Sequence, residues 1–295
     1  MKSQLLCFPC TVRTAYDIAT KATDDKNLQY RIVEETTRWL IDHPNLSELN
    51  PAAIHTRAFR ISTRISGNPD PFRHLKKFSN EMAMKVLPVL EREIKKMESF
   101  KDRFRFAVLG AICGNAIDFE VENYAFSLEN IEPFLLNCLK GEFAIDETAR
   151  LMEILLESKK VLYLLDNAGE IVFDKFLIKL IADHYPVTVW AAVKSRSILN
   201  DATMEDATQI GLGEVASVIT TGSDHIGLKL DESSKDFLEH LRNADLIIAK
   251  GQGHLESIQE VIISKPIAYI LRAKCILIAK ELGVPHHGNV VKVVS

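Results

Sequence analysis

The sequence has 295 residues, of which 36 are basic and 40 are acidic, giving a formal net charge of −4. Hydrophobic residues make up 47% and charged residues 26%, a balance typical of soluble globular proteins. This length suggests one large domain or two smaller ones, and either can bury a core without disulfides or structural metals. The chain lacks the basic excess that a broad nucleic-acid surface requires, so we expect no nucleic-acid partner.

The sequence favours a cytoplasmic protein without a membrane partner. No apolar run reaches the roughly 18 residues of a membrane-spanning helix, and the first residues lack the apolar core of a signal peptide. The oligomeric state is left open. An odd set of cysteines in so large a chain is not the pattern of a secreted disulfide framework; the set is Cys7, Cys10, Cys113, Cys138 and Cys275.

The first part of the chain, to about residue 145, shows apolar residues at helical spacing and almost no strand pattern. Its longest amphipathic stretch, residues 71–97, has one apolar stripe, with charged side chains on the opposite side. Pro, Gly and Asn clusters separate the segments. We predict helices over 24–43, 51–66, 71–97, 103–113 and 128–139.

From residue 146 to 295, short apolar runs alternate with helical stretches. Strands covered on both faces are continuous apolar runs, and their alternation with helices indicates βαβ units. The predicted fold class is α/β: a doubly wound, mostly parallel sheet in residues 146–295, with a helical N-terminal region, residues 1–145, packed on it. The predicted strands are 161–165, 187–193, 215–220, 246–249, 275–279 and 290–294, and the predicted helices are 170–184, 204–211, 233–242, 257–263 and 279–282.

Polar residues follow two neighbouring predicted strands, at the sheet edge where such folds bind ligands. Asp166 and Asn167 end the first strand and offer hard oxygen ligands, while the start of the next helix suits an anion. Asp201 follows the second strand, so it would share a crevice, and a divalent cation, with Asp166. The alternative at both places is a helix cap, for the helix from Glu170 or the helix from Met204.

Further along, Lys250 precedes Gly251-Gln252-Gly253, which places a cation next to exposed backbone N–H groups and suits an oxyanion. The order of residues is not that of a Walker A loop, and a tight turn is the alternative. Lys274, just before the predicted strand 275–279, is either a second positive charge at the site or a surface lysine.

Two other motifs are ambiguous by themselves. Asn115 and Asp118 interrupt an apolar helical run, where turn or capping roles are the alternative to function. Cys7 and Cys10 form one CxxC pair, which cannot complete a tetrahedral zinc site without further ligands. The pair also lacks a βαβ context that would support a redox role, so buried or helix-capping cysteines are favoured.

Taken together, four motifs resemble those of the metal-dependent damage-control phosphatase family, also called domain of unknown function 89. The motifs are DNAGE (166–170), LNDAT (199–203), KGQGH (250–254) and GNAID (114–118). CFPC (7–10), GNPDPF (67–72) and RAKC (272–275) resemble the branch common in archaea and some bacteria. The resemblance covers essentially the whole chain. Other branches carry an Arg-Thr-x-Lys signature where RAKC stands, so their sugar-phosphate specificity is not transferred.

The resemblance implies a divalent metal ion, typically manganese, cobalt, nickel or magnesium. The family's metal-binding positions correspond to Asp166, Asn167 and Asp201. Its phosphate-binding positions correspond to Lys250, Gly251, Gln252 and Lys274, with Asn115 and Asp118 at the mouth of the site and Glu170 at an acidic position of its motif.

These observations predict a hydrolase, a metal-dependent phosphatase that cleaves phosphate monoesters of small metabolites, including damaged or side-product ones. Asp166 is the first candidate catalytic residue, and Asp201 or Glu170 is the candidate proton acceptor for the attacking water. One alternative is an S-adenosylmethionine-dependent carboxyl methyltransferase, although no glycine-rich loop follows the first strand. The other is a non-catalytic protein that binds a phosphorylated metabolite.

Overall fold

The computed structural model describes residues 1–116, 128–258 and 263–295. Its centre is a seven-stranded sheet with the order β1-β7-β6-β5-β2-β3-β4. All neighbouring strands in it run parallel except β6 and β7. The strands are β1 (Phe143–Asp146), β2 (Lys160–Leu164), β3 (Thr188–Val193), β4 (Ser217–Thr220), β5 (Leu246–Lys250), β6 (Ile267–Arg272) and β7 (Asn289–Val294). The predicted fold class is confirmed.

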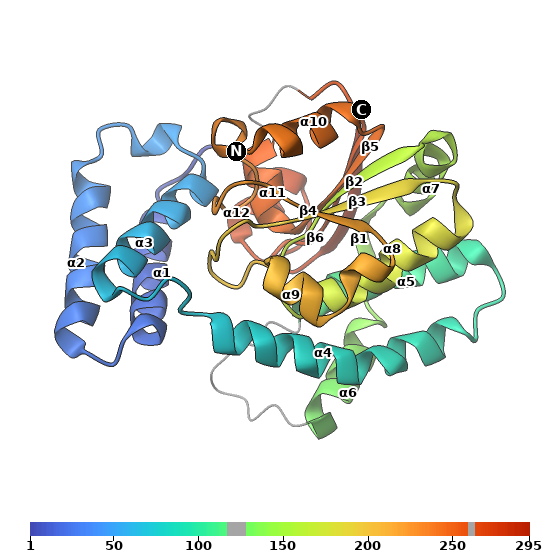
Figure 1. Cartoon of the computed structure of the whole chain (residues 1–295), viewed down its shortest axis with the longest axis horizontal. Helices are drawn as coiled ribbons and strands as arrows, with labels where there is room; N and C mark the ends of the chain where they lie inside the picture. Colours follow the sequence, from blue (N-terminus) through green and yellow to red (C-terminus); the bar gives the residue numbers. More distant parts are fainter. Residues whose placement is uncertain (117–127, 259–262) are drawn as a thin grey trace.

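Helices cover both faces of the sheet (Figure 1). Side chains alternate along a strand, so Val161 and Tyr163 of β2 join one hydrophobic core, while Leu162 and Leu164 join the other. The first core lies under α4 (Arg73–Ile94), α5 (Phe100–Ala116), α6 (Leu128–Cys138), α7 (Thr148–Glu157) and α8 (Glu170–His184), with α9 (Met204–Gln209) at its edge. The second core lies under α10 (Lys235–Asn243), α11 (Gly251–Ile258) and α12 (Ile276–Leu282).

Three N-terminal helices form a separate group beside the sheet: α1 (Cys7–Ala22), α2 (Lys26–Asp42) and α3 (Pro51–Ser66) (Figure 1). Asn50 caps α3 by accepting a hydrogen bond from the N–H of Ala53 at 2.8 Å. Arg60 of α3 ties the group to the α/β part, because its Nη2 lies 2.6 Å from Oδ1 of Asp224 and also contacts Glu232. These ion pairs therefore hold the helical group against the loops that follow β4.

Three sequence predictions are wrong in position. The run 275–279 begins helix α12, and the strand of this region is β6, which ends at Arg272. The helix predicted over 257–263 is α11, which starts directly after β5, at Gly251. Residues 143–146 form strand β1, where only helices were expected. Short apolar runs fit a strand and a buried helix equally well, which explains the first error.

The cysteines divide into a pair and three free thiols. Cys113 of α5 and Cys138 of α6 form a disulfide, which the sequence did not predict. Cys7, Cys10 and Cys275 are free.

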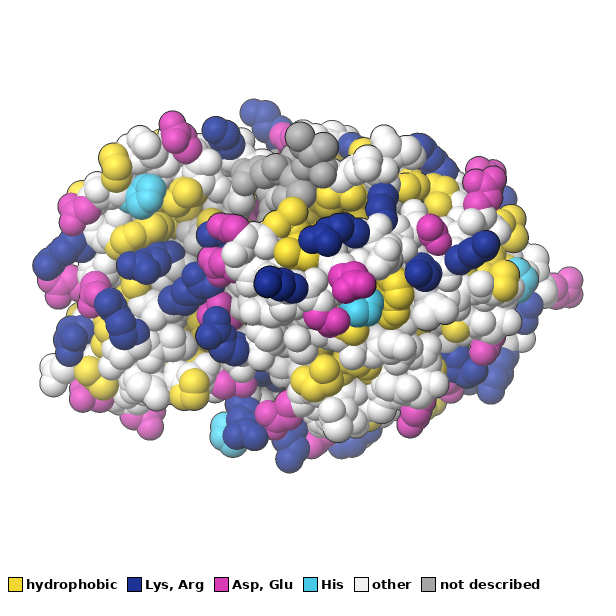
Figure 2. Space-filling model, turned by 45° about the horizontal axis from the view of Figure 1, so that its top comes forward, with side chains coloured by type: hydrophobic (Ala, Val, Ile, Leu, Met, Phe, Trp, Pro, Cys, Tyr) yellow, Lys and Arg dark blue, Asp and Glu magenta, His cyan; other side chains and the backbone are white. Residues whose placement is uncertain are grey.

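In the part of the chain that the structure describes, no helix combines the length and apolar character needed to cross a bilayer. On the face shown in Figure 2, basic and acidic side chains are interspersed, with hydrophobic side chains between them.

Candidate active site

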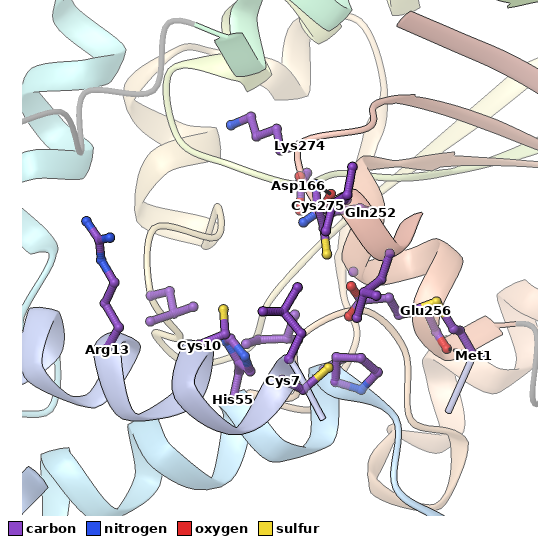
Figure 3. Close-up of a pocket in the computed structure, with 18 of the residues that line it drawn as sticks. Met1, Cys7, Cys10, Arg13, His55, Asp166, Gln252, Glu256, Lys274 and Cys275 are labelled. Atoms are coloured by element: carbon purple, nitrogen blue, oxygen red, sulfur yellow. Dashed lines mark hydrogen bonds between the residues drawn. The ribbon is translucent and has the colours of Figure 1, made fainter. Parts of the chain in front are cut away.

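A cavity of about 640 Å³ lies between the N-terminal helices and the carboxyl ends of the strands. Its volume is in the range of small-molecule sites, roughly 300–1,000 Å³. The sheet side contributes Asp166, Asn167, Asn200, Asp201, Gln252 and Lys274, and α1 and α3 contribute Cys7, Cys10, Arg13 and His55. In Figure 3, Asp166, Gln252 and Lys274 lie on the opposite side of this space from Cys10 and His55.

The loops after β2 and β3 are joined by backbone contacts at the cavity. The N–H of Ala202 donates to the carbonyl of Asp166 at 2.7 Å, and Asn167 and Asp201 form an isolated β-bridge. The two acidic motifs therefore meet, as expected for residues that follow adjacent parallel strands. Asp201 is buried, whereas Asp166 and Asn167 are half-buried and border the cavity.

Gly251 is where α11 begins, and it packs directly on a site carboxylate. Its φ is +74°, and a Cβ at this position would lie 1.9 Å from Oδ2 of Asp166. No side chain fits at that distance, and an L side chain rarely adopts this backbone conformation. The glycine after Lys250 is thus required both by the turn and by the carboxylate next to it.

Helix α4 positions the loop after β2. The buried Asn80 accepts a hydrogen bond from the N–H of Gly169 at 2.6 Å and donates to Oδ1 of Asp206 at 3.0 Å. Gly169 has φ +79°, and its virtual Cβ would lie 3.1 Å from Cβ of Ser79. Asn80 was not predicted as a site residue from the sequence. The sequence feature that could have indicated it is an amide side chain among the apolar residues of this helix.

Lys250 lies behind the cavity. Its side chain is 0% exposed, its Nζ is 2.9 Å from Oδ1 of Asp174, and it also contacts Glu170. Glu170 is itself only 1% exposed, and Asp174 accepts a hydrogen bond from the hydroxyl of Tyr163 at 2.6 Å. The structure therefore places Lys250 and Glu170 one layer behind Asp166, and their roles towards a phosphate stay predictions.

Lys194 is a buried cation that the sequence reasoning did not single out. It directly follows β3, is 2% exposed, and has its Nζ 3.6 Å from Oδ2 of Asp201. It also donates a hydrogen bond to the carbonyl of Gly227. The sequence feature that could have indicated Lys194 is its position at the end of a predicted strand, seven residues before Asp201.

Burial and mutual repulsion make the carboxylates of the site hard to ionise. Burial, with Glu170 and Asp201 nearby, raises the pKa of Asp166 well above its usual value. Burial raises the pKa of Glu170 to about 7 and that of Asp201 to about 6, although Lys250 and Lys194, respectively, act in the opposite direction. A cation among these groups would favour their charged forms.

The donor set fits a divalent cation. Carboxylates outnumber buried ammonium groups at the site by four to two. The carboxylates are those of Asp166, Glu170, Asp174 and Asp201, and the ammonium groups are those of Lys194 and Lys250. Two carboxylates and the Asn167 amide border the cavity with hard oxygen atoms, which magnesium and manganese prefer. Across the described ranges, no group of three His, Cys, Asp or Glu side chains is arranged to hold a metal ion. The third ligand beside Asp166 and Asp201 would therefore be the amide oxygen of Asn167.

The remaining predicted residues divide into two groups. Gln252 and Lys274 line the cavity, and Oε1 of Gln252 accepts a hydrogen bond from the N–H of Cys275 at 3.3 Å. Because β6 ends at Arg272, Lys274 follows a strand instead of preceding one. Asn115 lies in α5, with its side chain outside what the structure describes, and Asp118 lies outside the described residues.

The fold and the site define a class: a doubly wound α/β protein with an acidic, lysine-containing small-molecule site at the carboxyl ends of its strands. Residues 4–290 match the family model described as Damage-control phosphatase ARMT1-like domain. The chain belongs to this family.

Three relatives match over at least 93% of their own length. An uncharacterized protein of Methanocaldococcus jannaschii is 42% identical over 96% of this chain and 93% of its own length. A damage-control phosphatase of Archaeoglobus fulgidus is 37% identical over 100% of both chains. A damage-control phosphatase of Pyrococcus horikoshii is 36% identical over 97% of this chain and 96% of its own. The crystal structure of a DUF89 family protein from Pyrococcus horikoshii superimposes with a TM-score of 0.89, at 36% identity, covering 99% of this chain and 98% of the other.

Proposed function

We propose that this protein is a metal-dependent phosphatase that hydrolyses phosphate monoesters of small metabolites. The observation that carries the proposal is the meeting of Asp166, Asn167 and Asp201 at one wall of the cavity, which Lys274 also lines. Two full-length relatives are named damage-control phosphatases, which supports the same reaction and favours damaged metabolites as substrates.

Asp166, Asn167 and Asp201 would hold the divalent ion. When bound, such an ion polarises the phosphoryl group and lowers the pKa of a coordinated water. Manganese, cobalt, nickel and magnesium all suit oxygen donors, and the donor set does not select among them.

The chain's own residues supply the other requirements of phosphoryl transfer, which are positioning and neutralisation of charge. Lys274 reaches the cavity and would pair with a non-bridging phosphate oxygen. Asp201 lines the cavity and Glu170 does not, which favours Asp201 as the acceptor of the proton from the attacking water. Lys250 would act through Glu170, because it is bound to that carboxylate and to Asp174.

The test is hydrolysis of p-nitrophenyl phosphate by metal-stripped protein, with each divalent ion added back separately and no methyl donor present. We expect turnover only with metal, and a loss of at least about 100-fold in Asp166→Asn, because the substitution removes a charged metal ligand. The matched control is Asp183→Asn, an exposed aspartate of α8 that pairs with Lys179. Folded protein with no turnover under any ion, or full activity in Asp166→Asn, contradicts the proposal.

A further inference from the structure

The cavity is lined by both charged and apolar side chains. Asp166, Asp201, Arg272 and Lys274 come from the ends of the strands and the loops after them, while α1 adds Arg13 and α11 adds Glu256. Apolar side chains come from both sides of the space, from the segment that starts α1 and, across from it, from the start of α12 next to Lys274. These segments contribute Leu6, Pro9, Cys10, Ile276 and Leu277. Leu6 and Ile276 both line the cavity, and they are 49% and 51% exposed, so each leaves part of a large apolar side chain uncovered by protein.

Two thiols, one on each side of the cavity, add to this apolar lining. In Figure 3 the sulfur of Cys10 points from α1 into the cavity, and that of Cys275 points towards it from the opposite side. Burial, together with the neighbouring Cys275 thiol, raises the pKa of Cys10, so its thiol stays protonated near neutral pH. A protonated cysteine behaves as a small apolar side chain with weak hydrogen-bonding capacity.

Few of the polar groups near this apolar lining are available to a ligand. Burial lowers the pKa of His55 to about 4, so its ring is uncharged at neutral pH. Glu256 interacts electrostatically with the amino group of Met1. Arg13 lies a turn beyond Cys10 on α1, away from the carboxylates (Figure 3). The amides of Asn200 and Gln252 lie at the sheet wall, close to where the phosphate would bind.

A polyhydroxylated substrate matches this arrangement poorly. Its phosphate would bind at the sheet wall, and its more distant hydroxyl groups would lie against Leu6, Ile276 and Leu277, which offer no side-chain hydrogen bonds. Hydroxyl groups buried without partners weaken binding, whereas an apolar group at the same place releases water from the exposed leucine and isoleucine side chains.

We propose that the substrates are phosphate monoesters of apolar alcohols, alkyl or aromatic, whose apolar part contacts Leu6, Pro9, Cys10, Ile276 and Leu277. This inference rests on the proposed phosphatase function and adds the class of the leaving alcohol. In the reaction, water attacks phosphorus, the ester P–O bond breaks, and the alcohol leaves with a proton, giving inorganic phosphate.

The test compares esters of primary alcohols, so that intrinsic reactivity is similar. Hexyl phosphate, benzyl phosphate and glucose 6-phosphate are assayed with the manganese-loaded protein. We expect kcat/KM for hexyl and benzyl phosphate to exceed that for glucose 6-phosphate by at least about tenfold. Leu6→Asn, outside the core, and Leu277→Asn should reduce this preference at least about threefold. The control Ile41→Asn, at a 68% exposed position of α2, should leave it unchanged.

The outcomes separate the two proposals. Turnover with equal or greater kcat/KM for glucose 6-phosphate overturns the inference and leaves the phosphatase function intact. A preference for apolar esters that neither Leu6→Asn nor Leu277→Asn reduces also overturns it, because another surface must then bind the apolar group. Absence of turnover on every ester, p-nitrophenyl phosphate included, overturns both proposals.

Discussion

Nζ of Lys250 lies 2.9 Å from Oδ1 of Asp174, and neither side chain is exposed to solvent. The same ammonium group contacts Glu170, so one lysine is bound by two carboxylates behind the site. Burial by itself would lower the pKa of Lys250, but Asp174 and Glu170 raise it, so the lysine remains charged. The KGQGH motif thus contributes a buried cation, Lys250, and a glycine, Gly251, that packs on the carboxylate of Asp166.

Replacing Lys250 by Met should destabilise the protein strongly. Removing one partner of a buried ion pair leaves uncompensated charge and costs about 3–5 kcal/mol of the free energy of unfolding. Urea denaturation measures this loss. Lys179→Met is the matched control, because Lys179 pairs with Asp183 on the exposed face of α8 and should lose at most about 0.5 kcal/mol. Equal effects at the two positions would show that the buried pairing of Lys250 does not stabilise the fold.

Gly251→Ala should impair both stability and catalysis. The added Cβ would meet Oδ2 of Asp166, and φ of +74° disfavours alanine, so we expect a loss of about 2–4 kcal/mol and at least about 100-fold in kcat. Gly283→Ala separates the two causes. Gly283 has φ +68° with nothing within 4 Å of a virtual Cβ, so this variant should lose only about 1 kcal/mol and keep its activity. Similar losses in both variants would assign the effect to the backbone alone.

Asp201→Asn should stabilise the metal-free protein while abolishing turnover. The pKa of Asp201 is raised to about 6 by burial, from an ordinary value of 3.8, so the folded state holds its proton more tightly than the unfolded state. This group contributes stability when protonated, and the contribution is lost as the pH rises from about 4 to about 6. The variant's advantage should therefore grow over that window, reach about 1–3 kcal/mol, and stay constant at higher pH.

Comparing the variant with the wild type at each pH removes the effects of other titrating groups, such as the buried histidines. Added manganese should reverse the order, since ion binding stabilises the wild type more than a variant lacking one ligand charge. A difference in unfolding free energy that does not change between pH 4 and pH 7 would contradict the assigned environment of Asp201.

Asn80→Ala tests whether α4 positions the loop after β2. The substitution leaves the N–H of Gly169 and one oxygen of Asp206 without their partner, at a cost of about 1–3 kcal/mol. Because Gly169 follows Asp166 by three residues, kcat should fall, by about 10-fold, with KM changed less. Asn27→Ala, at an exposed position in the first turn of α2, should alter neither quantity. Unchanged kcat in Asn80→Ala would restrict Asn80 to a role in stability.

The sequence predicted the parts of the site that depend on strand ends. Asp166, Asn167 and Asp201 follow two apolar runs long enough to be recognised as strands, and adjacent parallel strands necessarily bring their ends together. Lys274 was placed beside the wrong strand, because the apolar runs before and after it have similar length, and only tertiary pairing with β5 and β7 identifies the first run as β6.

Other features depend on packing that a single sequence does not contain. Nothing in the KGQGH motif indicates that Lys250 is buried against Asp174, since the partner lies 76 positions away on another element. The placement of the N-terminal helices beside the site depends on distant contacts such as that of Arg60, in α3, with Asp224. Helix α1 (Cys7–Ala22) was not predicted at all, because the first helix expected from the sequence begins at residue 24.

The most direct test of the central claim is the rate of p-nitrophenyl phosphate hydrolysis as a function of added manganese, for metal-stripped wild type and for Asp166→Asn. The proposal predicts no turnover without metal, saturable activation of the wild type, and residual turnover of about 1% or less in the variant at saturating metal. Turnover that is independent of metal, or a variant that reaches the wild-type rate, would contradict the assignment of Asp166, Asn167 and Asp201 as the metal-binding residues of a phosphatase.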